Sequence, residues 1–109
     1  MNQWTTVCQI NDILPYSGIC ALVDEHHIAI FRPTEAKQLF AISNIDPFTK
    51  TSVLSQGLLA EHEGQLWVAS PLKKQRFRLI DGYCLEDAEF SVQAYPVQIV
   101  NDQVQISIK

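Results

Sequence analysis

The chain has 109 residues, of which 47% are hydrophobic and 18% are charged, and its formal net charge is −4. This length fits one domain with its own hydrophobic core, and the composition excludes a disordered chain. Nucleic acids and anionic membranes are held mainly by basic side chains, so an acidic chain is unsuited to either partner. No apolar run approaches the roughly 18 residues that a membrane span needs.

The first residues and the cysteines indicate the compartment. Residues 1–6 have neither the basic nor the apolar stretch of a secretory signal. The three cysteines, Cys8, Cys20 and Cys84, are odd in number and widely spaced, which is not typical of a disulfide framework. Free thiols fit a reducing compartment. We therefore expect a cytoplasmic protein in which the cysteines serve as small buried apolar side chains.

Short strands separated by tight turns follow one another along the chain. Alternating side chains predict strands over residues 18–23, 27–31, 38–43, 58–61, 65–69, 75–80, 97–100 and 104–108. Hairpin turn signals lie at Asp24-Glu25, Glu63-Gly64, Asp81-Gly82 and Asn101-Asp102. Helix is limited to single turns near residues 11–14 and 86–89. The spacing of the turns predicts an all-β fold, an antiparallel β-sandwich or partial barrel, in a single domain over residues 1–109.

Two segments, over about residues 44–54 and 67–79, carry the most specific pattern. Residues 43–48 read Ser-Asn-Ile-Asp-Pro-Phe, and residues 67–74 read Trp-Val-Ala-Ser-Pro-Leu-Lys-Lys before an alternating strand and the turn at Gly82. Both segments resemble the cluster-binding loops of Rieske domains, in which one strand leads into a Cys-x-His loop and another into a Cys-Pro-x-His loop. The resemblance implies a Rieske-like [2Fe–2S] domain fold with a smaller subdomain formed by the two loops.

The four ligand positions of that pattern are all changed in this chain. The resemblance puts Asp46 at the first cysteine, Phe48 at the first histidine, Ser70 at the second cysteine and Lys73 at the second histidine. A Rieske centre needs two thiolates and two imidazoles. Phe48 has no lone pair, and the ammonium of Lys73 offers only donors. The hard oxygen atoms of Asp46 and Ser70 are poor ligands for iron–sulfide, so we expect no cluster on this chain.

The resemblance extends along essentially the whole chain to one family. Residues 43–48, 60–62 and 66–79, together with the Trp4 region and residues 13–15, are similar to the small subunit of bacterial cytoplasmic NADH-dependent nitrite reductase of the assimilatory type. This likeness implies an accessory, non-catalytic subunit of an oxidoreductase that works in nitrogen metabolism. The implied partner is a large subunit that carries FAD, an iron–sulfur cluster and siroheme and uses NADH for the six-electron reduction of nitrite to ammonium.

Half of the eight Lys and Arg residues lie within six positions of this acidic chain. They are Lys73, Lys74, Arg76 and Arg78. One interpretation is a partner interface that docks on an acidic surface of the large subunit. The other is a solvated loop and the outward face of a strand, since charge runs are often only exposed surface. Within this group, Lys73 and Lys74 at the loop tip are the stronger candidates.

Other side chains suggest chemistry only weakly. Asp46 before Pro47 is common turn chemistry, and no second carboxylate is placed beside it by the sequence, so we expect no catalytic role. His26 and His27 are adjacent in an expected strand and point to opposite faces, so they are unsuited to binding one metal ion. Trp67, between apolar neighbours, is expected in the core.

Two other functions remain open at this point. An independent Rieske ferredoxin shares the fold but needs the two cysteines and two histidines that are absent here. A stand-alone binding or regulatory module is also compatible, because a fold does not determine a function. Co-purification with a siroheme flavoprotein would separate the accessory subunit from the stand-alone module.

Overall fold

A computed structural model describes residues 3–108 of the chain, and it is all-β, as the turn spacing predicts. Its strands are β1 (Thr5–Gln9), β2 (Ser17–Val23), β3 (His26–Arg32), β4 (Phe40–Ser43), β5 (Ile45–Asp46), β6 (Thr51–Ser52), β7 (Leu58–His62), β8 (Gln65–Ala69), β9 (Arg76–Arg78), β10 (Ala94–Tyr95), β11 (Val97–Val100) and β12 (Gln103–Ile106). Three short 3-10 helices, η1 (Ile10–Asp12), η2 (Leu54–Gln56) and η3 (Ala88–Phe90), lie between them. In the described residues, no helix is both long and apolar enough to span a membrane.

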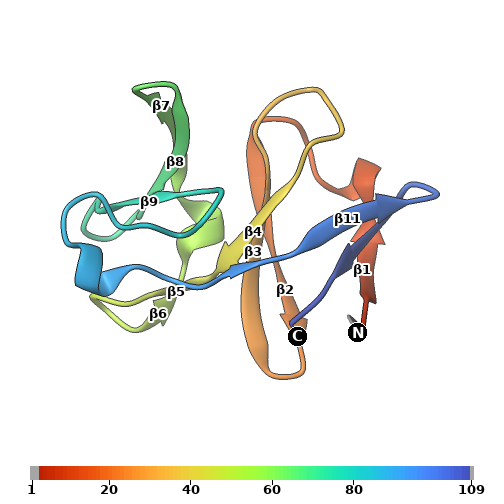
Figure 1. The fold of residues 1–109 in the computed structure, drawn as a ribbon, viewed down its shortest axis with the longest axis horizontal. Coiled ribbons are helices and arrows are strands. Elements are labelled where there is room, and N and C mark those ends of the chain that lie inside the picture. The colour runs from red at the N-terminus through yellow and green to blue at the C-terminus, as the bar shows by residue number, and fades with distance from the viewer. Residues whose placement is uncertain (1–2, 109) are drawn as a thin grey trace.

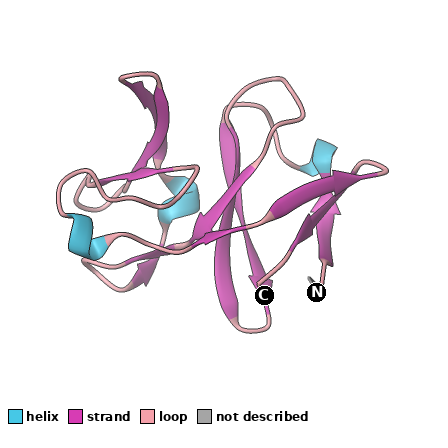
Figure 2. Ribbon diagram, viewed as in Figure 1, coloured by secondary structure: helices cyan, strands magenta, loops and turns pink. Residues whose placement is uncertain are grey.

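The strands form four sheets (Figure 1). The first, which holds both ends of the chain, has the order β1-β12-β11, and the central four-stranded sheet has the order β10-β4-β3-β2. The other two are β5-β6 and the three-stranded sheet β7-β8-β9. The first two sheets, which together we call the barrel region, occupy the right and middle of the view, and β5 to β9 form a loop region on the left (Figures 1 and 2).

Two-residue turns connect hairpins at three of the four positions that the sequence predicts, the exception being Asp81-Gly82. Asp24 and Glu25 have φ of 46° and 68°, and Asn101 and Asp102 have φ of 51° and 65°. Gly64 follows Glu63 in the same way, with φ of 77° after 51°. Positive φ at both central residues defines the type I′ turn, whose twist matches that of the flanking strands. These turns set the register of β2 with β3, β7 with β8 and β11 with β12.

Two hydrophobic cores lie on opposite faces of β3. Ile28 and Ile30 belong to an aliphatic core between the central sheet and the β1-β12-β11 sheet, with Val104 and Ile106 of β12. The alternate residues Ala29 and Phe31 belong to a second core that the loop region covers. Its other buried members are Ile42, Leu54, Val68, Phe77, Leu79 and Cys84. Strand β3 is therefore buried on both faces, and it joins the barrel region to the loop region.

The sequence analysis misses β1, β5, β6 and β10 and overextends some strands. The expected strand over residues 75–80 is only β9 (Arg76–Arg78), because the chain turns through Gly82 at φ 78° soon after it. Trp67 and Cys84 are buried as expected, whereas Cys20 is exposed and Cys8 is half-buried, so the expectation for those two cysteines is wrong. Cys20 lies on β2, an edge strand that has a neighbouring strand on one side only.

Candidate functional site

The loop after β4 is anchored by Asn44, which sequence reasoning missed. This side chain is 2% exposed. Its amide oxygen accepts a hydrogen bond from the backbone N–H of Ser55 at 2.6 Å, and its amide nitrogen donates to Oγ of Ser52 at 2.7 Å. Asparagine commonly bonds nearby backbone groups in turns, so its position at the end of a strand was the available signal. These bonds position the β5–β6 hairpin that carries Asp46.

The second loop follows β8 and closes on itself. The N–H of Ser70 donates to the carbonyl of Gln75 at 2.8 Å, and the N–H of Lys74 donates to the carbonyl of Ser70 at 3.0 Å. Lys74 has φ of 66°, in the left-handed region. The tight closure leaves residues 71–74 exposed at the tip while Ser70 is only 1% exposed.

Asp46 and Ser70 join the two loops directly. Oγ of Ser70 donates to Oδ2 of Asp46 at 2.5 Å, and the Asp46 side chain is fully buried. The other carboxylate oxygen accepts from the N–H of Phe48 at 2.8 Å. Oγ of Ser70 also accepts from the N–H of Leu72 at 3.3 Å. The structure thus brings together two of the residues that the resemblance assigns to cluster ligands, and they bond to each other.

Phe48 and Lys73 occupy quite different surroundings. The Phe48 ring stacks on Phe90, with centroids 4.5 Å apart and planes at 20°, and lies 6.4 Å from the ring of Phe77. Phe90 is a contact that the sequence did not indicate. Lys73 is exposed on the loop tip. The aromatic ring therefore packs over the second core, while the ammonium faces solvent.

The four residues do not fit a [2Fe–2S] cluster. Both oxygens of the Asp46 carboxylate already accept hydrogen bonds from the protein, and Ser70 is bound to one of them. The Phe48 ring, which has no ligand atom, stacks on an aromatic ring. In place of the two thiolates and two imidazoles of a Rieske centre, the chain has a carboxylate and a hydroxyl that are hydrogen-bonded to each other, a phenyl ring and an ammonium.

Asp46 is also unsuited to act on a substrate. Its side chain is fully buried, and its carboxylate is engaged on both oxygens by Phe48 and Ser70. A general acid or base must come within hydrogen-bond reach of the reacting group. The position supports a structural role for Asp46 as the residue that joins the two loops.

The basic residues of the second loop divide into two kinds. Nε of Arg76 lies 2.7 Å from Oε2 of Glu86, and Nη2 of Arg78 lies 2.6 Å from Oδ2 of Asp81. The hydrogen bond from Arg78 holds the pKa of Asp81 below its usual value. Arg78 also lies over the rings of Trp67 and Tyr83, at 5.5 and 4.9 Å from their centroids.

Lys73 and Lys74 differ from the two arginines in their pairing. Both lysines are exposed, and within residues 3–108 neither forms an ion pair. Each arginine charge is instead offset by an acid of the same region. In the sequence, the nearby acids Asp81 and Glu86 were the signal that could have distinguished the paired arginines from the unpaired lysines.

The two neighbouring histidines have separate partners. Nδ1 of His26 lies 3.4 Å from the hydroxyl of Tyr95, and Nδ1 of His27 lies 3.0 Å from Oγ of Ser52. Across the described part of the chain, no three His, Cys, Asp or Glu side chains are grouped to hold a metal ion. Burial raises the pKa of the Cys84 thiol, which keeps it protonated and weakly nucleophilic.

Comparison with known proteins gives the family. The model of the Rieske-like [2Fe–2S] domain matches residues 3–107. The nitrite reductase (NADH) small subunit of Escherichia coli K12 is 59% identical over 106 residues, which cover 97% of this chain and 98% of that protein. A solution NMR structure of the Escherichia coli protein NirD covers 98% of this chain and 97% of its own, with a TM-score of 0.92.

A longer relative contains a similar segment. The nitrite reductase [NAD(P)H] large subunit of Klebsiella oxytoca is 39% identical over 103 residues, which cover 94% of this chain but only 11% of that protein. Near full-length identity of 59% and the match to the domain model agree with the observed fold. The chain therefore belongs to the Rieske-like [2Fe–2S] domain family and, within it, to the small subunits of NADH-dependent nitrite reductase.

Proposed function

We propose that this chain is an accessory, non-catalytic subunit that supports the six-electron reduction of nitrite to ammonium by a large subunit. The observation that carries the proposal is the hydrogen bond between Asp46 and Ser70. The two loops hold each other through the protein's own side chains, in a chain similar over nearly its full length to small subunits of nitrite reductase. The chain would contribute binding surface to the complex, with electron transfer left to its partner.

The large subunit is the proposed partner, and the Klebsiella oxytoca protein supports it. A segment similar to this chain is there part of one long polypeptide called the large subunit. Within one polypeptide, covalent linkage keeps two domains at a high effective concentration. We infer that the separate small and large subunits associate in the same way. In our proposal the large subunit carries FAD, an iron–sulfur cluster and siroheme, takes electrons from NADH, and works with this chain in the cytoplasm.

Lys73 and Lys74 are the proposed docking charges. Both are exposed at the tip of the second loop, beside Leu72, whose side chain is 49% exposed. Because Arg76 and Arg78 are already paired with acids of this chain, they have less charge to offer an acidic surface and serve mainly to support the loop. That residues 1–109 form one domain, with its altered ligand loops at about 44–54 and 67–79, remains our prediction.

Co-expression tests the function. The tagged chain is expressed with the large subunit and purified through the tag, and NADH-dependent nitrite reduction is assayed with and without it. We expect the large subunit to co-purify in fixed proportion, activity to depend on the chain, and the chain alone to contain no stoichiometric iron. A failure to co-purify, with activity indifferent to the chain, would instead support a stand-alone binding module.

Charge reversal tests the docking residues. We expect Lys73→Glu to weaken the complex by about threefold to tenfold at low salt and by less at high salt, because rim charges act through screened attraction. Lys37→Glu is the matched control, since Lys37 is an exposed lysine of the barrel region, paired with Asp102. Equal binding by both variants would remove Lys73 from the interface.

A further inference from the structure

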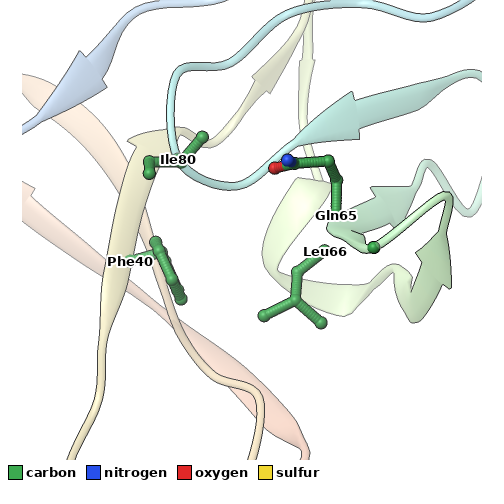
Figure 3. A pocket seen from close by; sticks show the side chains of 5 residues that line it. Phe40, Gln65, Leu66 and Ile80 are labelled. Carbon is green, nitrogen blue, oxygen red and sulfur yellow. The ribbon is translucent and has the colours of Figure 1, made fainter.

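A small cleft lies between β4 of the central sheet and the β7–β8 hairpin (Figure 3). Its volume is about 160 Å³, and it is lined by Phe40, Gly64, Gln65, Leu66 and Ile80. Figure 3 shows Phe40 and Ile80 on one side of the opening and Gln65 and Leu66 on the other. The cleft forms where the second core ends.

The walls of this cleft are apolar and accessible. Ile80 is 64% exposed, while Phe40 and Leu66 are half-buried beside the second core. At the hairpin turn, a Cβ on Gly64 would meet no atom within 4 Å, so this end is open. Exposed apolar side chains at a concave site gain free energy when another apolar group covers them.

The rim of the cleft is polar and acidic. Glu61 stands directly opposite Leu66 in the β7–β8 ladder, and Glu63 precedes Gly64 in the turn. Both glutamates are exposed, and among the described residues the only ionic partner of Glu63 is its neighbour His62, at 3.6 Å. Gln65 is exposed on the same rim, and within residues 3–108 its side chain forms no hydrogen bond. Its amide is free to bond the backbone of a bound segment.

We propose that this cleft receives an apolar side chain carried by a basic segment of the large subunit, an inference that rests on the proposed function. The apolar walls would bury the inserted side chain, and Glu61 and Glu63 would attract flanking Lys or Arg residues. This site is distinct from Lys73 and Lys74, because Gln65 and Leu66 line the cleft at the start of β8, whereas the loop tip follows the last residue of this five-residue strand. Five strand residues span roughly 13 Å. Contacts of opposite charge at the two ends would fix the orientation of the partner.

Truncation of the exposed wall tests the apolar contact. Ile80→Ser removes the accessible apolar side chain without disturbing a buried one, and Leu22→Ser is the matched control on β2, where Leu22 is 66% exposed. In binding measurements between the full chain and the large subunit, we expect Ile80→Ser to raise Kd about tenfold. We expect Leu22→Ser to change it less than twofold. Equal Kd values for both variants would overturn the inference.

The rim charge has its own matched pair. We expect Glu61→Lys to raise Kd about threefold at low salt, with the effect fading at high salt, because exposed charges are screened. Glu35→Lys reverses an exposed charge on the loop between β3 and β4 and should leave Kd unchanged. Tighter binding by Glu61→Lys would mean that an acidic segment covers the cleft and would contradict the proposed chemistry.

A photocrosslinker identifies the occupant. Benzoylphenylalanine in place of Gln65, irradiated in the complex, should attach to a large-subunit segment in which an apolar residue is flanked by Lys or Arg. Attachment to a second copy of this chain, or to nothing while the complex forms, would overturn the cleft proposal and leave the proposed function standing. If the unaltered chain forms no complex at all, the proposed function fails and the cleft proposal falls with it.

Discussion

The barrel region and the loop region are held together in different ways. In the barrel region, β2 and β3 pair over seven residues each, and the core between the sheets is mainly aliphatic. The loop region has strands of two to five residues and buries Asn44, Asp46 and Ser70. Long ladders tolerate the loss of one contact, whereas a loop whose shape depends on a few buried hydrogen bonds does not. The part of the molecule that we propose to bind a partner therefore depends on individual polar side chains.

The strongest challenge to a division into two regions is the shared strand β3. Phe31 and Phe77 are both fully buried in the second core. We expect Phe77→Ala to lower the free energy of unfolding by about 3–5 kcal/mol, measured by urea denaturation. Because β3 also supports the first core, the loss should appear in one cooperative transition. Leu14→Ala, at a side chain 70% exposed, should change stability by less than about 0.5 kcal/mol. Two separate transitions would show that the regions unfold independently.

Two glycines have the same backbone conformation but different surroundings. Gly64 has φ of 77° and Gly82 has φ of 78°. Alanine at either position should cost about 1–2 kcal/mol for the left-handed conformation. At Gly82 the new Cβ would also overlap the carbonyl of Val92, which adds about 1–3 kcal/mol of overpacking. In thermal unfolding, Gly82→Ala should therefore have a lower melting temperature than Gly64→Ala. An equal loss would mean that the chain near Val92 moves aside freely.

The bond between the loops is the third test. We expect Asp46→Ala to destabilise the protein by about 1–3 kcal/mol, because it leaves buried donors of Ser70 and Phe48 without their acceptor. Ser70→Ala should reduce stability by less, because the Asp46 carboxylate loses one hydrogen-bond donor but still accepts a bond from the N–H of Phe48. Chemical denaturation of both single variants and the double variant gives their coupling energy, which should lie between about 0.5 and 3 kcal/mol. Additive effects would show that the two loops are held by their other contacts.

The smallest expected effect concerns the surface pair of Arg78 and Asp81. In the folded chain, the hydrogen bond from Arg78 lowers the pKa of Asp81 below its ordinary value of 3.8. The Asp81 carboxylate therefore binds a proton more readily in the unfolded chain than in the folded one. The pair therefore stabilises the fold above pH 3.8, and this contribution is lost as the pH falls through the lower folded pKa. Screening keeps it small at a side chain 48% exposed. Relative to the unaltered chain, Asp81→Asn should be less stable at pH 7, with the difference shrinking toward pH 2 in denaturation experiments.

Local signals explain why much of the fold is visible in the sequence. The turns at Asp24-Glu25 and Asn101-Asp102 join strands that alternate in polarity, and each hairpin forms from neighbouring residues. Strand β1 was missed because its partner is distant: Thr5 pairs with Ile106 at the other end of the chain. Strand β10 has only two residues, which is too short for a periodic pattern.

The candidate site was only partly visible for a related reason. The altered positions at Asp46 and Ser70 could be identified by their place in two loops, but their direct bond depends on how the loops meet in space. The stacking of Phe48 on Phe90 joins residues 42 positions apart and has no local pattern. The cleft beside Phe40 and Ile80 also arises from the meeting of separate elements. Packing between elements, and not periodicity, creates these features.

The pairing of the first and last strands has a consequence for how the domain can be attached to other proteins. Thr5 and Ile106 are neighbours in one ladder, and both ends of the chain lie on the side away from β5 to β9 (Figure 1). A linker at either end would leave the fold from the same edge, so the order of the fused modules would hardly alter the geometry of the product. Fusion at this edge keeps the loop region clear of the linker, and the domain can be transplanted between polypeptides without rebuilding its binding surface.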